Sequence, residues 1–203
     1  LGLGDSAVVG ALPIPDPGSF YPTDTITAAL QLIGGRERYG TGSPEGVVTA
    51  AVGTYYNDTA GTTGAWRWQK RTGAGNTGWA VADGDTGTRL VAASLINGWT
   101  ASGGGVWIRR VGPEVTLRVY AMTASAMTAI GFLTIPDGFK GIDSNGRGVL
   151  HTGTGPPAAV WRTGFSSNVI AIPGATTATP SLTGYVKWFT TDAWPTSLPG
   201  TAA

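Results

Sequence analysis

Turn-forming residues interrupt this chain along its whole length, with 33 glycines and 13 prolines among its 203 residues. Glycine readily takes positive φ angles and proline lacks an amide hydrogen, so both residues end regular elements and form turns. Lys and Glu, which favour helices, occur three times each, whereas Thr, which favours strands, occurs 29 times. The chain is therefore predicted to be mostly β, with short strands joined by tight turns.

Composition also narrows the classes of function. Eight Trp, six Tyr and five Phe supply aromatic area that an ordered chain buries. The net charge is +1 without a basic cluster, so no nucleic-acid partner is predicted. No apolar run reaches the roughly 20 residues of a membrane span and no secretion signal is visible, so no membrane partner is predicted. The chain lacks cysteine, which excludes disulfides and thiolate metal sites.

Residues 1–39 are predicted to form an extended arm followed by one short helix. The arm, residues 1–22, is rich in glycine and proline. The helix is predicted from Asp24 to the glycine pair at 34–35, and at about ten residues it is too short to be stable alone. We expect it to promote trimer formation, although packing on its own domain accounts for the pattern equally well. Its single apolar stripe consists of Ile26, Leu30 and Ile33.

Residues 40–89 are predicted to form a small β-hairpin module that ends in a linker. Strands are expected at 47–56 and 65–70, with a third, short strand at 79–81 and the linker at 83–87. Two or three short strands bury little apolar area and are marginally stable alone. The module is therefore expected to depend on neighbouring chains.

Residues 90–203 are predicted to form an antiparallel β-sandwich of the jelly-roll type, because turn signals separate short strands at the spacing of such folds. The strands are expected at 106–110, 114–120, 129–134, 148–152, 159–163, 168–172 and 184–190. Alternation along the first two strands assigns to the core Val106, Ile108, Val115, Leu117 and Val119. The opposite face then carries Trp107, Arg109, Arg118 and Tyr120.

Residues suited to catalysis are sparse. His151 is the one histidine and no G-x-S-x-G turn surrounds a serine, so a Ser–His–Asp relay is not predicted. Most acids lie in turn sequences and none belongs to a recognisable acid–base motif. Asp83 opens a stretch similar to a calcium loop, but Ser94 occupies the position of the required Glu. The chain is therefore predicted not to be an enzyme, and no catalytic residue, metal or cofactor is assigned.

Tryptophan is the residue type in the C-terminal half that is best suited to a ligand, because its ring can stack on the face of a sugar. Most tryptophans nevertheless fill cores. One or two of the five in this half are expected at a ligand, and the others in the core or at an interface. The five are Trp99, Trp107, Trp161, Trp188 and Trp194.

A pattern of Gly, Thr, Tyr and Trp runs through residues 43–50, 53–58, 64–70 and 73–79. It resembles the recurring hairpin module of bacteriophage tail proteins of the fibre and receptor-binding class. The C-terminal half is similar to the ends of minor tail proteins from phages of actinobacteria. The segments that carry this second similarity are 84–87, 97–99 and 188–200.

The resemblance implies a homotrimer at the tip of a phage tail, which is an extracellular position on the virion. It implies that the N-terminus joins other tail proteins, that the hairpin module forms a neck, and that the C-terminal sandwich forms a head. The head is then the part that binds a host cell-surface polysaccharide without cleaving it. Three chains wound together also stabilise a short helix and a small module that bury little area alone. Few charges, 12% of residues, suit a chain that buries surface between subunits.

The family pattern assigns no ligand residues, so the site is predicted from chemistry alone. Turn-flanked stretches that mix polar, basic and aromatic groups are the usual location of binding sites. This criterion selects Asp143, Asn145, Arg147, His151, Trp161 and Arg162 as the glycan site.

Three other functions fit the sequence. The chain is suited to act as a carbohydrate-binding module of a secreted bacterial enzyme, although the N-terminal helix and hairpin module then lack a purpose. A tail-associated depolymerase is the second alternative, and Asp143 and Asp192 are the acids whose replacement tests it. The third is a purely structural tail component without a receptor.

Overall fold

The computed structural model places most of the chain beyond the N-terminal arm. The described residues are 34–101, 103–124, 131–141, 148–152, 160–166, 169–171 and 179–203. The arm and most of the helix predicted within residues 1–39 therefore lie outside the described residues. The chain divides into two compact units, which consist of Leu1–Ala60 with Arg67–Ala80 and of Gly61–Trp66 with Val81–Ala203.

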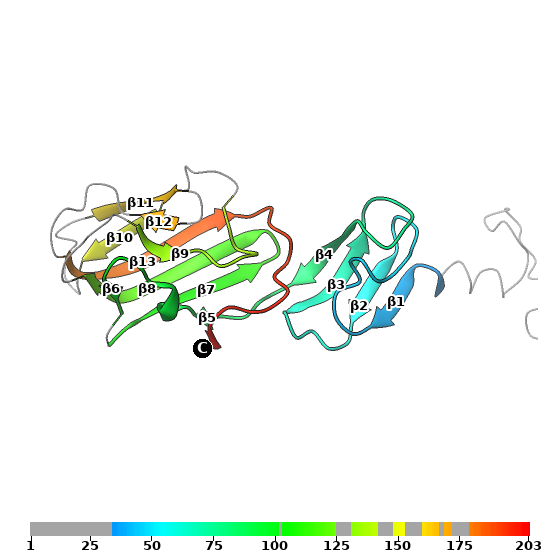
Figure 1. The fold of residues 1–203 in the computed structure, drawn as a ribbon, viewed down its shortest axis with the longest axis horizontal. Coiled ribbons are helices and arrows are strands. Elements are labelled where there is room, and N and C mark those ends of the chain that lie inside the picture. Colours follow the sequence, from blue (N-terminus) through cyan, green and yellow to red (C-terminus); the bar gives the residue numbers. More distant parts are fainter. Residues whose placement is uncertain are drawn as a thin grey trace, which may run out of the picture. The chain divides into compact units, whose positions relative to one another are not determined.

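The described part of the chain is built from strands, which confirms the prediction of a mostly β protein (Figure 1). Most strand pairs are antiparallel, whereas β1 and β2 run parallel. Helical structure in these residues is nearly limited to the 3₁₀ helix η2 (Ala92–Ser94). Among them no helix has the length and hydropathy needed to cross a membrane.

A four-stranded sheet has the strand order β1-β2-β3-β4. Its strands are β1 (Glu37–Gly40), β2 (Tyr55–Asp58), β3 (Ala65–Lys70) and β4 (Trp79–Gly84). The prediction for residues 65–70 is confirmed. The strand expected at 47–56 is wrong over most of its length, because Gly46 and Gly53 take positive φ angles of 76° and 90° and turn the chain. The linker expected at 83–87 is partly strand, since β4 continues to Gly84.

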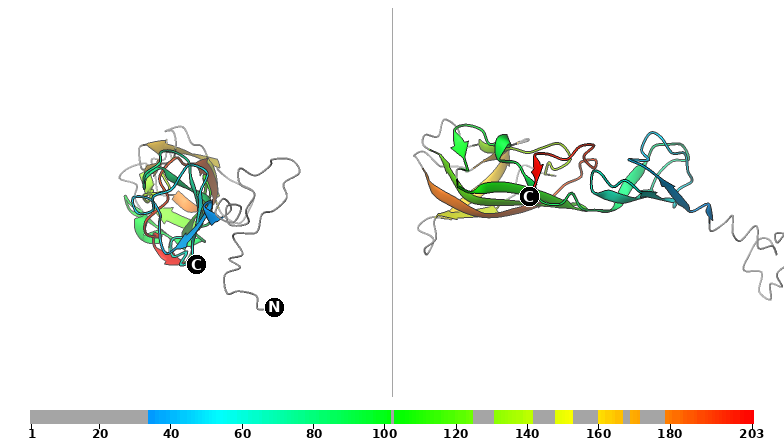
Figure 2. Two further views of the ribbon diagram at one scale, coloured as in Figure 1. Left: turned by 90° about the vertical axis from the view of Figure 1, so that its right-hand side faces the viewer. Right: turned by 90° about the horizontal axis from the view of Figure 1, so that it is seen from below.

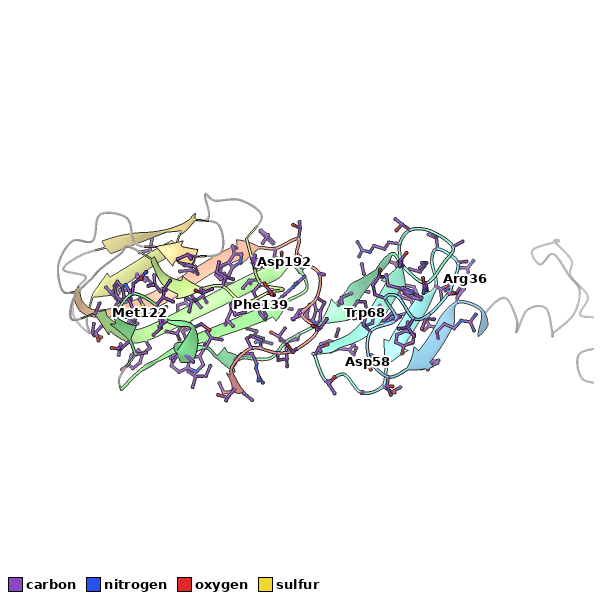
Figure 3. The ribbon with its side chains drawn as sticks, viewed as in Figure 1. Arg36, Asp58, Trp68, Met122, Phe139 and Asp192 are labelled. Carbon is purple, nitrogen blue, oxygen red and sulfur yellow. The ribbon has the colours of Figure 1, made fainter. Side chains whose placement is uncertain are left out.

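Aromatic and charged side chains share the interior of the first unit. Tyr56, Trp68 and Trp79 are buried, and the rings of Tyr56 and Trp79 meet edge to face with centroids 6.1 Å apart (Figure 3 labels Trp68). Lys70 is fully buried beside them; its ammonium donates to the carbonyl of Thr77 and lies 5.8 Å from the Trp79 ring. The apolar interior of this unit is thus small, as the short strands imply.

The second unit contains a ten-stranded sheet. Nine strands follow the order β14-β5-β7-β8-β13-β10-β11-β12-β9, and β6 pairs with β8 beside this path. Their bounds are β5 (Arg89–Leu90), β6 (Trp99–Thr100), β7 (Gly105–Val111), β8 (Glu114–Ala124), β9 (Gly131–Thr134), β10 (Gly148–Thr152), β11 (Val160–Ser166), β12 (Val169–Ala171), β13 (Thr179–Phe189) and β14 (Thr201–Ala202). Figure 2 shows the long strands β7, β8 and β13 side by side in one curved layer.

Alternation along β7 and β8 separates an inner from an outer face as predicted. Val106 and Ile108 are fully buried together with Val115, Leu117 and Val119 of the neighbouring strand. The same core contains residues from the far end of the sheet path, namely Phe132 and Leu133 of β9 and Ile170 of β12. The sheet therefore bends around a single hydrophobic core, in which Figure 3 labels Met122 and Phe139.

Candidate functional site

The residues predicted to bind a glycan are only partly described. Asp143, Asn145 and Arg147 lie outside the described residues. His151 is half-buried on β10, where it pairs with Thr183 of β13. On the other side of β10, Trp161 pairs with Leu150 and Arg162 pairs with Val149. The sheet thus brings His151, Trp161 and Arg162 onto two adjacent strands.

The tryptophans of the second unit divide between core and surface. Trp99, Trp188 and Trp194 are buried, and the indole N–H of Trp188 donates to the carbonyl of Phe139 at 2.7 Å. Trp107 is half-buried on the outer face of β7. The side chain of Trp161 is outside what the structure describes. Of the tryptophan side chains described on the ten-stranded sheet, Trp107 is the one placed to meet a ligand on the outer face.

The outer face of the second sheet carries a row of side chains that crosses four strands. Val149 of β10 pairs with Tyr185 of β13, Tyr185 pairs with Arg118 of β8, and Arg118 pairs with Trp107 of β7. Tyr185 is 60% exposed. Tyr120 lies two residues beyond Arg118 on the same face and is 44% exposed. Neighbouring strands lie about 4.8 Å apart, so this row is a compact surface of rings and one guanidinium.

A cation–π contact joins the two central members of this row. The guanidinium carbon of Arg118 lies 4.9 Å from the centre of the Trp107 ring. Trp107 in turn lies over Gly105, because a Cβ at position 105 would come within 2.4 Å of the indole ring. A glycine therefore allows the indole to lie against its own strand, and the indole supports the arginine.

Two ion pairs occupy the neighbouring positions of the outer face. Arg109 donates to Asp85 through Nε at 2.9 Å and through a second, close contact. These bonds lower the pKa of the Asp85 carboxyl and raise the pKa of the Arg109 guanidinium. Lys187 and Glu114 form the second pair, at 2.7 Å. The charges that flank the row are therefore balanced within the protein.

A pocket with a volume of about 650 Å³ lies elsewhere in the second unit. The turn after β9 and the loop after β13 form its walls. Its polar groups are the exposed carboxylate of Asp137, the ammonium of Lys140 and the hydroxyls of two loop residues. The residues that line it are Pro136, Asp137, Gly138, Lys140, Asp192, Ala193, Trp194, Pro195, Thr196, Ser197 and Pro199.

Arg110 holds the two walls of this pocket together. Its guanidinium donates to the carbonyls of Asp192 at 3.0 Å and Ala193 at 3.1 Å, and also to the carbonyl of Gly138. The ring of Trp194 lies 4.8 Å from the guanidinium carbon. Burial lowers the pKa of Arg110, and the nearby charge of Asp192 opposes that effect. These structural bonds occupy most of the N–H donors of the Arg110 guanidinium.

The two acids of the pocket also have partners within the protein. Asp192 accepts backbone N–H bonds from Gly138 at 3.1 Å and Lys140 at 3.0 Å, and Figure 3 labels its position. Asp137 pairs with Lys140, and this hydrogen bond raises the pKa of the lysine. Asp192 thus fixes the turn, which leaves the pair of exposed Asp137 and half-buried Lys140 as the charged feature of the wall.

The described residues are better suited to a ligand-binding surface than to a metal centre. Within them no three His, Asp or Glu side chains gather closely enough to hold a metal ion. The outer face offers aromatic rings, hydroxyls and a stacked guanidinium, which together suit a polyhydroxylated ligand.

Sequence reasoning placed Trp107, Arg118 and Tyr120 on one face but did not assign them to the site. The signal was the alternation itself, which left two aromatic residues and an arginine on the side away from the core. The pocket was missed because the contacts of Arg110 span up to 83 residues of sequence.

Comparison of the chain with family models, with curated proteins and with solved structures found no match.

Proposed function

We propose that this chain is a receptor-binding protein of a bacteriophage tail, which attaches the virion to a host cell-surface glycan without cleaving it. The observation that carries the proposal is the row of side chains on the outer face of the sheet, with Tyr185, Arg118 and Trp107 on adjacent strands. Aromatic faces stack on sugar rings, and guanidinium and hydroxyl groups bond to their oxygens. The sequence resemblance to tail proteins supplies the biological context.

The assembly proposed for this function is a homotrimer. In it the C-terminal unit is a two-layer sandwich head at the tail tip, and the N-terminal region contacts other tail proteins. The small, partly polar interior of the first unit supports this arrangement, because neighbouring copies supply the apolar contacts that a thin module lacks. The low fraction of charged residues, 12%, supports it as well.

Attachment is tested with fluorescently labelled protein and a panel of actinobacterial strains. We expect staining of susceptible cells, competition by polysaccharide extracted from the same cells, and no release of reducing sugar. Absence of staining across all strains contradicts the receptor role and favours a structural tail component. Release of reducing sugar supports a depolymerase instead.

Assembly is tested by light scattering coupled to size exclusion. The chain mass is 20.7 kDa, so a trimer gives three times that value, about 62 kDa. A stable monomer with a cooperative melt contradicts the trimer. It then favours the second candidate, a carbohydrate-binding module, since the row on the sheet is complete within one chain.

A further inference from the structure

We propose that Arg118 is an oxyanion-recognition residue, and that the glycan bound on the outer face is therefore an acidic one. The proposal rests on the proposed glycan-binding function and names the chemistry of its ligand. A carboxylate on the sugar and a phosphodiester in the chain present the same chemistry to a guanidinium, namely paired oxygens with negative charge.

A ring contact holds Arg118 in place, whereas its guanidinium donates no hydrogen bond to the side chains and carbonyls that the structure describes. Gly105 lets the Trp107 ring lie against β7, and the guanidinium lies 4.9 Å from the centre of that ring. A cation–π contact restrains an arginine through its face and leaves its N–H groups at the edge unoccupied. A restrained side chain loses less conformational entropy when a ligand binds.

The other arginines of this unit whose side chains the structure describes all have partners within the chain. Arg89 donates to the carbonyls of Pro199 and Gly200, Arg109 to Asp85, and Arg110 to four carbonyls. Arg118 differs from these three, because among the described residues no carboxylate lies within ion-pair distance of it. Its charge is thus available to a partner outside the chain.

The charges that surround Arg118 on the outer face are balanced by ion pairs. The nearest cations of the outer face, Arg109 and Lys187, are paired with Asp85 and Glu114. Arg109 and Lys187 both lie in the cross-strand row of Thr116, next to the row of Arg118. Among the described side chains of this face, Arg118 therefore keeps a positive charge without an acidic partner, which complements a negative group of the ligand. By register, Arg162 occupies the same cross-strand row beyond Val149.

Two tyrosine rings flank the guanidinium of Arg118. Tyr185 lies opposite Arg118 on β13, and Tyr120 lies two residues along β8. A sugar that stacks on a tyrosine ring places its acidic substituent about one strand spacing away, near the guanidinium. The row therefore fits an acidic sugar unit better than an isolated anion, which needs no ring surface.

The experiment measures binding of the full chain to three immobilised polymers: alginate, which carries carboxylates; wall teichoic acid, which carries phosphodiesters; and neutral dextran. We expect the wild type to bind at least one acidic polymer and to bind dextran at least tenfold more weakly. Arg118→Gln should reduce acidic-polymer binding at least tenfold, as expected for loss of a charge-assisted bond pair. Arg118→Lys keeps the charge but not the fork and should be intermediate.

Arg109→Gln is the matched control, because it removes the same charge from the same face but from a residue already paired with Asp85. It should change binding less than twofold, and melting temperatures identify any variant that has lost its fold. Equal losses in Arg118→Gln and Arg109→Gln overturn the inference, and so does equal binding of dextran and the acidic polymers. Failure of the wild type to bind either acidic polymer also overturns it, whereas the receptor role fails only if labelled protein stains no cells.

Discussion

The two units of this protein bury very different amounts of apolar side chain. The second unit has a large apolar core, with fully buried residues such as Ile108, Leu117 and Phe132 from separate strands, and Arg110 is the one charged residue among its buried, described residues. The buried set of the first unit includes Lys70 and Asp58 among a few aromatic rings. The second unit is therefore stabilised mainly by burial of apolar area, whereas the first depends on particular polar contacts that tie its loops to the sheet.

These polar contacts are hydrogen bonds between the loops and the strands of the first unit. Asp58 accepts N–H bonds from Gly42 at 2.8 Å and Ala60 at 2.9 Å. The carboxylate of Glu45 accepts the N–H of Trp79 at 2.7 Å, and the indole N–H of Trp79 donates to a backbone carbonyl. Each contact replaces a water that the group would otherwise bind, so the loss of one partner leaves the other unsatisfied.

The largest expected effect is in the apolar core of the second unit. Phe132→Ala removes a fully buried ring whose centroid lies 6.0 Å from that of Trp99, and should lower the free energy of unfolding by about 3–5 kcal/mol. Urea unfolding followed by tryptophan fluorescence measures this change. Phe189→Ala, at a ring that is 60% exposed, is the control and should cost less than about 0.5 kcal/mol. Similar costs for both variants would contradict the view that this unit depends on its core.

In the first unit, Lys70 provides the sharpest test. Lys70→Ala removes the donor to Thr77 and leaves a void, and should destabilise the unit by about 3 kcal/mol. Lys70→Met keeps the packing of the aliphatic stem and should cost only about 1 kcal/mol. Hydrogen exchange across residues 65–84 reports this locally, which matters because two units need not unfold together. Equal loss of protection in both variants would show that the charge, and not the stem, is what the site requires.

A paired substitution compares carboxylates with the same task in the two units. Asp58→Ala should cost about 2 kcal/mol, because Asp58 is a buried residue whose carboxylate accepts two N–H bonds. Asp192→Ala removes two similar bonds at a half-buried site and should cost about 1 kcal/mol. Urea unfolding of both variants gives the two values. A larger loss of stability in Asp192→Ala than in Asp58→Ala would contradict the proposal that the first unit depends more on polar contacts than the second.

The smallest effect is the pH dependence of the Asp85–Arg109 pair. The bond from Arg109 lowers the folded-state pKa of Asp85, so its stabilisation is fully present above the unfolded pKa and is lost as pH falls through the folded pKa. Asp85→Asn should therefore cost about 0.5 kcal/mol at neutral pH, a gap that closes as the pH falls from about 5 toward 2. Melting temperatures of both proteins across this range provide the measurement. If the difference in stability between the two proteins stays constant in acid, the effect comes from packing and not from the charge of Asp85.

Local patterns predicted the elements of the second unit better than those of the first. Alternation along β7 and β8 is strong because one face of each strand is buried, so Val106 and Val119 were placed correctly. In the first unit β1 was not anticipated, since the four residues from Glu37 include no buried residue and show no alternation of apolar and polar groups. The turn at 46–53 likewise depends on glycines, and their positive φ angles cannot be read from the alternation of apolar and polar residues.

The candidate site was predictable only in part. The mixture of polar, basic and aromatic residues beside turns placed the predicted site within residues 143–162. The described row on the outer face is instead centred on Arg118. Alternation had already placed Arg118 beside Trp107 on that face. What the sequence could not show is that Gly105 accommodates the indole ring or that Arg109 is neutralised by Asp85, because both depend on distances in the folded chain.

The buried guanidinium of Arg110 has a consequence for the environments in which the second unit keeps its shape. It joins its own strand to Gly138 and to Ala193, which are 28 and 83 residues away in the sequence, in a chain that contains no cysteine. This non-covalent cross-link holds together loops that are distant in the sequence, as a disulfide does in many exported domains. Because it contains no redox-active bond, reducing agents leave it intact, and the loops around it should have the same structure in oxidising and reducing surroundings.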